Sequence, residues 1–231
     1  MHNSTEWKYL YKIDKDDLTE NIETNLLYTP YYSNGILKIS FDHTSYYQNE
    51  YLTNKGLIRN YTPELVEFFF NREIYFLEKL KNKSYAPTIL EINKTEQYIL
   101  IEFPGETLNQ IVYTDRSLNN ELPNWKEQLS FIVKDLYNSG YYKTSLYPHC
   151  FFIQDGVLKT FDFYGCAEQS NPFVKLSDIE GMMGPGSVER FQRATEGPLL
   201  NIEIFYKEAL KTFIQWPDNY LSIIYKEIYN E

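Results

Sequence analysis

The sequence predicts an α+β protein with a strand-rich first half and a mainly helical second half. Short runs rich in aromatic and β-branched residues, bounded by turn residues, fill much of the chain from 36 to 103. After Pro104 and Gly105, apolar residues recur mostly at helical spacing. Such segregation of strands and helices is typical of the α+β class. We therefore expect two lobes, 1–103 and 104–231.

Composition limits the class of protein. With 231 residues, 43% hydrophobic and 23% charged, the chain is expected to be globular. Its net charge of -10 argues against nonspecific binding to nucleic acid or anionic membranes, because the field repels phosphate. No apolar run has the length of a membrane span, and the polar start shows no signal-peptide core. The two cysteines form no disulfide framework, which favours a cytoplasmic location.

Strands are expected throughout the first half. They are predicted at 36–41, from about residue 46, and at 56–61, 86–92 and 97–103. Turns are expected at 42–45 and 93–96, while residues 1–30 give no clear element.

One helix interrupts the strands. It begins after Thr62, a capping residue, with Pro63 in the first helical position, and it runs to about Lys81. Its apolar face contains Val66, Phe69, Phe70, Phe76, Leu77 and Leu80. Glu73 lies in the middle of that face by the 3.6-residue period. A buried carboxylate needs a cation, and Arg59 is the nearest candidate, ahead of Lys55 and Lys38. Spacing alone favours a structural ion pair, or a Glu at the rim of the apolar stripe, over a functional role.

The second half is read as mainly helical. A helix is expected at 124–139, with an apolar stripe, and Gly140 ends it. Asp155 and Gly156 predict a hairpin joining strands at 150–154 and 157–163. The remaining elements are helices at 199–214 and 219–229, with a glycine-rich loop at 181–186.

The segment from Tyr141 to Ile153, followed by Asp162, Phe163 and Tyr164, resembles a known pattern. A helix ends, a loop containing Leu146 and Pro148 follows, and a hairpin leads to Asp-Phe. This order is similar to the catalytic loop and metal-binding motif of the protein-kinase-like superfamily, including aminoglycoside phosphotransferases and lipopolysaccharide sugar kinases. The resemblance implies a bilobal fold with an N-terminal antiparallel sheet and one helix.

The resemblance also assigns site positions. Ser145 falls on the catalytic Asp, Lys143 on the preceding His, Cys150 on the metal-binding Asn and Asp162 on the main metal ligand. Lys143 could also stabilise charge on a terminal phosphate. Asp162 as a simple turn carboxylate is the plainer alternative.

In the first half, the resemblance implies a nucleotide site. Arg59 would replace the strand lysine that holds phosphates, and Glu73 would be its helix partner. Glu102 and Pro104 would meet the adenine, mainly through backbone groups. ATP and Mg²⁺ are therefore the expected cofactors, while the acceptor, a small molecule or a protein, is not identified.

The departures from the family pattern concern catalysis. There is no glycine-rich phosphate loop, and Ser145 cannot accept a proton as a carboxylate does. Loss of a general base typically costs about 10²- to 10⁴-fold in rate. Cys150 is a soft ligand, whereas Mg²⁺ prefers oxygen. His149 is read as structural, since one His beside one Cys does not make a metal site.

Three functions from different classes remain open at this point. The first is a pseudokinase that binds ATP and has weak or no phosphoryl transfer. The second is an active, atypical phosphotransferase acting on a sugar or other small molecule through Asp162, Arg59 and Lys143. The third is a structural or interaction protein without a nucleotide site.

Overall fold

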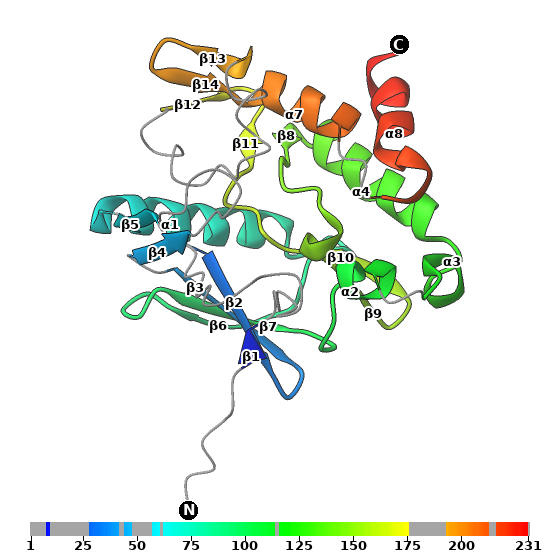
Figure 1. The fold of residues 1–231 in the computed structure, drawn as a ribbon, viewed down its shortest axis with the longest axis horizontal. Coiled ribbons are helices and arrows are strands. Elements are labelled where there is room, and N and C mark those ends of the chain that lie inside the picture. The colour runs from blue at the N-terminus through cyan, green and yellow to red at the C-terminus, as the bar shows by residue number, and fades with distance from the viewer. Residues whose placement is uncertain are drawn as a thin grey trace, which may run out of the picture. The chain divides into compact units, whose positions relative to one another are not determined.

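The structure is a computed structural model that describes residues 8–9, 28–41, 44–47, 57–60, 62–113, 116–175, 193–212 and 216–230 (Figure 1). It divides into two compact units. Unit 1 comprises Met1–Tyr75 and Pro87–Gly105, and unit 2 comprises Phe76–Ala86 and Glu106–Glu231. The main sheet belongs to unit 1 and most described helices belong to unit 2, which confirms the α+β class.

Unit 1 is built on a five-stranded antiparallel sheet with the order β1-β2-β3-β7-β6. Its strands are β1 (Lys8–Tyr9), β2 (Tyr28–Ser33), β3 (Ile36–Phe41), β6 (Ile89–Asn93) and β7 (Tyr98–Glu102). Leu37 lies opposite Ile101, and Ile39 lies opposite Ile99. These four side chains are fully buried, so alternate residues of the two central strands form one core face.

The strands predicted at 36–41, 86–92 and 97–103 are confirmed, with small shifts at their ends. The β2 strand was missed, and its Pro30 weakens a strand pattern because proline cannot donate to the ladder. A usable signal lies directly after it. Asn34 and Gly35 have φ values of 47° and 81°, the conformation of a two-residue hairpin turn.

A separate two-stranded ladder pairs β4 (Thr44–Tyr47) with β5 (Leu57–Asn60). The predicted turn over 42–45 is wrong for Thr44 and Ser45, which begin β4; Asp42 and His43 lie outside the described residues. Thr44 is β-branched and two tyrosines follow Ser45, so strand pairing with β5 prevails over a local turn.

The α1 helix (Pro63–Leu80) begins as predicted. Thr62 Oγ1 accepts a hydrogen bond from the Leu65 backbone N–H at 3.3 Å. A backbone hydrogen bond and a contact with Thr62 lower the pKa of Glu64. All six residues of the predicted apolar face are buried: Val66, Phe69, Phe70, Phe76, Leu77 and Leu80.

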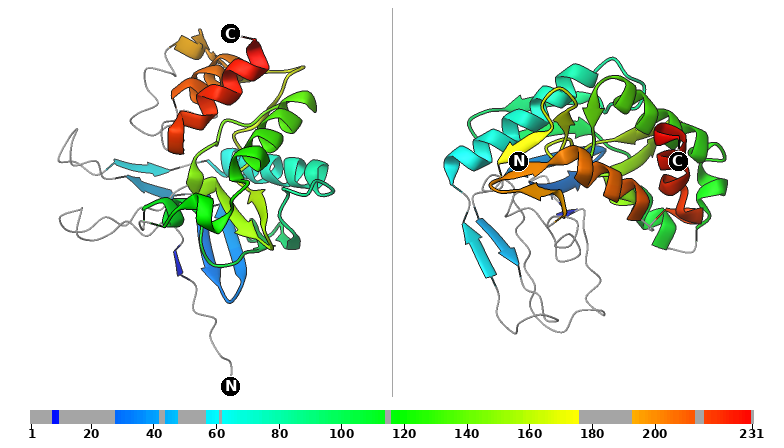
Figure 2. Two further views of the ribbon diagram at one scale, coloured as in Figure 1. Left: turned by 90° about the vertical axis from the view of Figure 1, so that its right-hand side faces the viewer. Right: turned by 90° about the horizontal axis from the view of Figure 1, so that it is seen from above.

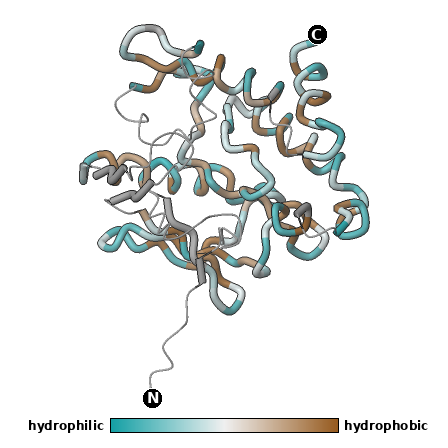
Figure 3. Tube along the Cα trace, viewed as in Figure 1, coloured by the Kyte–Doolittle hydropathy of each residue, from teal (hydrophilic) through white to brown (hydrophobic). Residues whose placement is uncertain are grey.

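Among the described helices of unit 2, those at 125–138, 202–212 and 220–229 lie at predicted positions, whereas those at 108–113 and 118–121 were not predicted. These helices are α2 (Leu108–Tyr113), α3 (Leu118–Glu121), α4 (Trp125–Asn138), α7 (Ile202–Thr212) and α8 (Tyr220–Tyr229), with short 3-10 turns η1 (Pro148–Cys150) and η4 (Pro217–Asn219). The α4 stripe is buried as expected, and Gly140, with φ 87°, follows the helix end. The α7 and α8 helices lie side by side (Figure 2). Hydrophobic and hydrophilic residues alternate along these helices, as amphipathic packing requires (Figure 3). No helix in the described part of the chain is both long and apolar enough to cross a membrane.

Short antiparallel ladders complete unit 2. The pairs are β9 (Phe151–Gln154) with β10 (Val157–Thr160), β8 (Tyr141–Tyr142) with β11 (Ala167–Glu168), and β14 (Leu199–Asn201) with both β12 (Phe173–Lys175) and β13 (Thr195–Glu196). Asp155 and Gly156 form the predicted turn, both with positive φ.

The expected helix start at residue 199 is wrong, because Leu199–Asn201 form the central strand of a ladder. The helix begins at Ile202 instead, where Asn201 Oδ1 accepts hydrogen bonds from the N–H groups of Glu203 and Ile204. An Asn in the capping position is the sequence signal for this boundary. The loop predicted at 181–186 lies outside the described residues.

Residues 76–86 belong to unit 2 through specific contacts. The Tyr85 hydroxyl donates to Asp135 Oδ2 at 2.7 Å, and the Thr160 N–H donates to the Tyr85 carbonyl at 2.9 Å. Burial and the Asp135 carboxylate raise the pKa of Tyr85. The predicted division lies between residues 103 and 104, two residues before the observed division after Gly105. Residues 76–86 precede both divisions in sequence but belong to unit 2.

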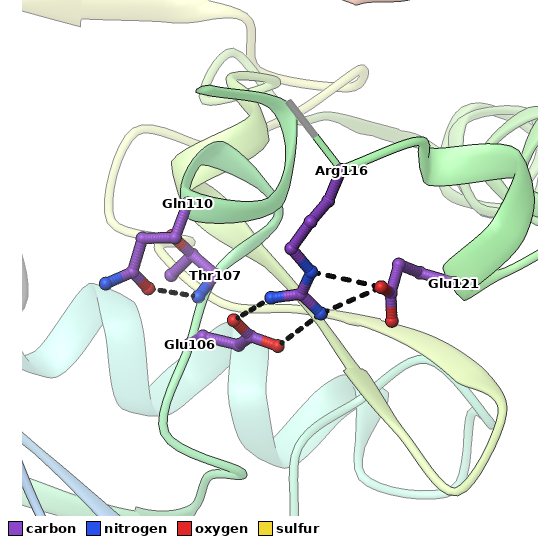
Figure 4. A network of polar contacts seen from close by, with 5 residues as sticks. All are labelled: Glu106, Thr107, Gln110, Arg116 and Glu121. Atoms are coloured by element: carbon purple, nitrogen blue, oxygen red, sulfur yellow. Dashed lines mark hydrogen bonds and ion pairs between the residues drawn. The ribbon is translucent and has the colours of Figure 1, made fainter. Parts of the chain in front are cut away.

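The chain that follows Gly105 is held by polar contacts (Figure 4). The guanidinium of Arg116 contacts Glu106 at 2.7 Å and Glu121 at 3.0 Å. Gln110 Oε1 accepts a hydrogen bond from the Thr107 N–H at 2.7 Å. Thr107 and Gln110 thus form one half of a capping box at the start of α2.

The α8 helix offers a matched test of its packing. Ile224 is 0% exposed, whereas its neighbour Ile223 is 42% exposed. Ile224→Ala should lower the free energy of unfolding by about 2–5 kcal/mol, because it removes buried methyl groups and leaves a cavity. Ile223→Ala should change it by less than about 1 kcal/mol. Urea denaturation of both variants checks this; equal losses would contradict the described packing.

Candidate functional site

Two loops of unit 2 lie side by side because of strand pairing. Residues 143–150 connect β8 to β9, and residues 161–166 connect β10 to β11. Since β8 pairs with β11 and β9 pairs with β10, the two connections run between the same two ladders. This brings Lys143, Ser145 and Cys150 to the Asp-Phe-Tyr segment, as the sequence order implied.

Lys143 joins the two loops. Its ammonium donates hydrogen bonds to the carbonyl oxygens of Phe161 at 2.8 Å and Asp162 at 2.6 Å. The same group lies 4.7 Å from the centre of the Phe163 ring. Lys143 is only 1% exposed, and a buried ammonium is tolerated because these acceptors and the ring replace its water. Lys143 therefore fixes the backbone that carries Asp162.

A second contact holds the same loops. The Thr144 hydroxyl donates to the Gly165 carbonyl at 3.0 Å. A Cβ atom on Gly165 would lie 2.8 Å from Thr144 Oγ1, closer than real Cβ contacts. Residue 165 thus needs to be glycine because the neighbouring loop approaches its backbone.

Asp162 has unusual backbone and side-chain surroundings. Its φ of 67° is left-handed, which costs a non-glycine residue about 1–2 kcal/mol. The side chain is 5% exposed, and Oδ2 accepts a hydrogen bond from Cys150 Sγ at 3.2 Å. The other oxygen, Oδ1, is buried and has no hydrogen-bond partner. Strain together with an unsatisfied buried oxygen is more common at functional sites than in a plain turn.

Burial sets the protonation of this group of side chains. It raises the pKa of Asp162 to about 6, against the opposing effects of Lys143, Cys150 and Ser145. Burial and the Lys143 charge lower the pKa of His149 to about 4. Burial and the Asp162 charge raise the pKa of the Cys150 thiol. At pH 7 the site therefore has a neutral imidazole, a protonated thiol and an ionised carboxylate.

Ser145 and Cys150, the two substituted positions, both interact with Asp162. The structure thus brings four predicted site residues together within unit 2. Sequence reasoning missed His149 as a fifth. The register of the predicted hairpin is a signal that could have found it. The turn at Asp155 and Gly156 pairs residue 151 with residue 160, so residues 150 and 161 come next along the two strands. Residues 149 and 162 are then close neighbours.

Arg59 and Glu73, the predicted phosphate-binding pair, belong to unit 1. Glu73 is 0% exposed, which confirms its burial on the apolar face of α1. Arg59 is the third residue of β5, but its side chain lies outside the described part, so its pairing with Glu73 stays a prediction.

Glu102 and Pro104, the two residues expected to meet the adenine, have no backbone N–H available for a hydrogen bond to it. The Glu102 N–H already donates to the Thr88 carbonyl at 3.0 Å, and Pro104 has no N–H. Neither residue therefore offers a backbone N–H to a base.

The groups around Asp162 do not fit Mg²⁺. That ion prefers an octahedral shell of oxygen atoms. Next to Asp162, the described residues of unit 2 offer a thiol and an imidazole, from Cys150 and His149. The buried ammonium of Lys143 adds positive charge to the same region. A single carboxylate in these surroundings is a weak protein contribution to a magnesium site.

The chain is similar to solved structures of the bifunctional kinase-methyltransferase WbdD. Three such structures match at 15% sequence identity, with TM-scores of 0.43, 0.45 and 0.45. One of them is a co-crystal structure with the kinase inhibitor LY294002. The matches cover 87–90% of this chain but only 44–49% of those chains, so this chain spans about half of their length. No family model and no curated protein matches it.

Lys143→Met tests the junction between the two loops. Methionine keeps the length of the side chain but leaves the carbonyl groups of Phe161 and Asp162 without this donor. We expect the free energy of unfolding to fall by about 2–4 kcal/mol, because hydrogen bonds to charged groups are worth more than neutral ones. Urea denaturation measures it, with the exposed Lys175→Met as control. Equal stability of the two variants would contradict the role of Lys143.

Asp162 should make stability depend on pH. Its folded pKa of about 6 lies above the ordinary value of 3.8, so the folded state binds the proton more tightly. This tighter proton binding adds to the free energy of unfolding. The added free energy is fully present below about pH 4 and is lost as the pH rises through about 6. Relative to Asp162→Asn, the wild type should lose on the order of 3 kcal/mol between pH 4 and pH 7.

Urea unfolding of both proteins in EDTA-containing buffer at pH 4, 5, 6 and 7 measures this difference. Subtracting the variant removes the contributions of the other titrating groups. A constant difference over that range would show that Asp162 titrates as an ordinary exposed carboxyl.

Proposed function

We propose that this chain is a pseudokinase: a kinase-fold domain that retains a nucleotide site and has lost efficient phosphoryl transfer. The observation that supports it most directly is the Cys150 thiol donating to Asp162. In the family pattern this pair would be two oxygen ligands of a metal. Here the carboxylate is held by a thiol inside the protein.

The loop that carries Ser145 has no carboxylate of its own at or near the position of the catalytic Asp. Segment 143–150 contains no Asp or Glu. His149, with a pKa lowered to about 4, is a poor proton acceptor at pH 7, since a general base works best with a pKa near the working pH. A loss of about 10²- to 10⁴-fold in transfer rate is the expected consequence.

The nucleotide site is proposed for unit 1. Arg59 would hold the phosphates and Glu73 would position the Arg59 side chain, while Glu102 and Pro104 would meet the adenine, mainly through backbone groups. Since the Asp162 surroundings do not fit Mg²⁺, binding of ATP is expected to depend little on that ion. Bound Mg²⁺ would neutralise part of the negative charge of the ATP phosphates.

Thermal denaturation with ATP, with and without Mg²⁺, tests nucleotide binding. ATP should raise the melting temperature of the wild type by a similar amount in both cases. Arg59→Ala should weaken ATP binding about 10- to 100-fold, the value of one or more charged hydrogen bonds. Arg116→Ala, in the exposed network of unit 2, serves as the control. No shift with ATP would favour the structural or interaction protein.

Radiolabelled ATP separates the pseudokinase from the active phosphotransferase. Single-turnover assays with sugar and protein acceptors should show no transfer by the wild type above the buffer rate. Transfer that Asp162→Ala abolishes would overturn the proposal in favour of the atypical phosphotransferase. The double variant Ser145→Asp, Cys150→Asn restores the family pattern, and a gain of transfer there would identify these two positions as the cause of the loss.

A further inference from the structure

Three potential metal ligands from two segments of unit 2 lie together. One ligand atom each from His149, Cys150 and Asp162 lies within 4.8 Å of the other two. The η1 turn carries His149 and Cys150, and Asp162 follows β10. The Cys150 carbonyl accepts hydrogen bonds from the Thr160 hydroxyl at 3.0 Å and the Phe161 N–H at 3.1 Å. These bonds hold the two segments in register, so the cluster is part of the folded core.

An independent observation indicates a ligand at this place. Asp162 Oδ1 is buried without a hydrogen-bond partner, although its residue is only 5% exposed. An unpartnered buried carboxylate oxygen is costly and rare in folded proteins. The other oxygen already faces the Cys150 sulfur. A cation bound by Oδ1 would give this oxygen a partner.

We propose that His149, Cys150 and Asp162 form a binding site for a borderline divalent metal ion, of which Zn²⁺ is the best fit. Imidazole nitrogen, thiolate sulfur and carboxylate oxygen are the three ligand types of protein zinc sites. Mg²⁺ and Ca²⁺ select oxygen ligands and are not favoured by a sulfur. The Cys150 thiol releases its proton to solvent as the sulfur binds the ion, and water completes the fourth position.

The three ligand atoms, which lie within 4.8 Å of one another, need to draw together around the ion. Zinc lies about 2.3 Å from sulfur and about 2.0–2.2 Å from nitrogen or oxygen, so tetrahedral ligand atoms are about 3.4–3.6 Å apart. The sulfur of Cys150 and Oδ2 of Asp162 are 3.2 Å apart and need to separate by a few tenths of an ångström. His149 is half-buried, and its ring stacks on the ring of Tyr147 with 5.1 Å between the centroids, so this pair has to shift for His149 to bind the ion.

The charges around the site are close to balanced. The thiolate and the carboxylate together neutralise the two charges of the ion. The ammonium of Lys143 adds one positive charge, but it is directed to the carbonyl oxygens of Phe161 and Asp162. The site uses residues of unit 2 alone and does not depend on nucleotide binding in unit 1, so failure of one proposal leaves the other standing.

Cobalt absorption tests the site directly. Co²⁺ takes the place of Zn²⁺, and a bound thiolate gives a sulfur-to-cobalt charge-transfer band with the visible bands of a tetrahedral ion. Untagged, EDTA-treated protein should develop these bands with one equivalent of Co²⁺, and Zn²⁺ should displace it. Cys150→Ser should abolish the charge-transfer band, and His149→Gln should weaken Co²⁺ binding at least about 100-fold, more than the typical loss for an outer-shell partner.

Matched controls come from the remaining cysteine and another histidine. Cys166→Ala and His43→Gln should keep the bands of the wild type, and circular dichroism should show that each variant is folded. Absence of the bands in the wild type, or their persistence in folded Cys150→Ser, would overturn the proposal. If Cys150→Ser does not fold, the half-buried His149→Gln decides, since unchanged Co²⁺ affinity there would equally refute the site.

Discussion

The described site depends on one buried ammonium. Lys143 binds two consecutive carbonyl groups and lies over the ring of Phe163, so it holds the Asp-Phe-Tyr segment against the loop before the hairpin. A charge in an apolar interior is stable only where such partners meet it. The backbone of Asp162 is therefore held in a left-handed conformation, and its carboxylate is directed to Cys150. The Lys143 charge also acts on the carboxylate, since it opposes the rise in the pKa of Asp162 that burial causes.

The same arrangement links the two proposals. In the proposed pseudokinase, Ser145 and Cys150 stand where the family pattern has a base and a hard ligand. In the proposed metal site, Cys150 joins His149 and Asp162 in a donor set that suits a softer ion. Cys150 therefore has a part in both proposals.

Much of the fold could be predicted because local signals and tertiary packing agree. The caps of α1, its apolar face and the hairpin turn at Asp155 and Gly156 each rest on residues within a few positions. The errors occurred where partners distant in sequence prevail. Leu199–Asn201 form a strand only because two other strands flank them, and Pro30 in β2 hides a strand that the sheet stabilises.

From the sequence alone came the α+β class, the order of elements and the two substituted positions, because these depend on spacing and residue type. Only the tertiary structure showed that Lys143 is buried against backbone carbonyl groups and that His149 joins Cys150 and Asp162. The reason is physical. Burial and distance between segments depend on how ladders β8–β11 and β9–β10 pair, and that pairing is a property of the whole folded unit rather than of any single segment.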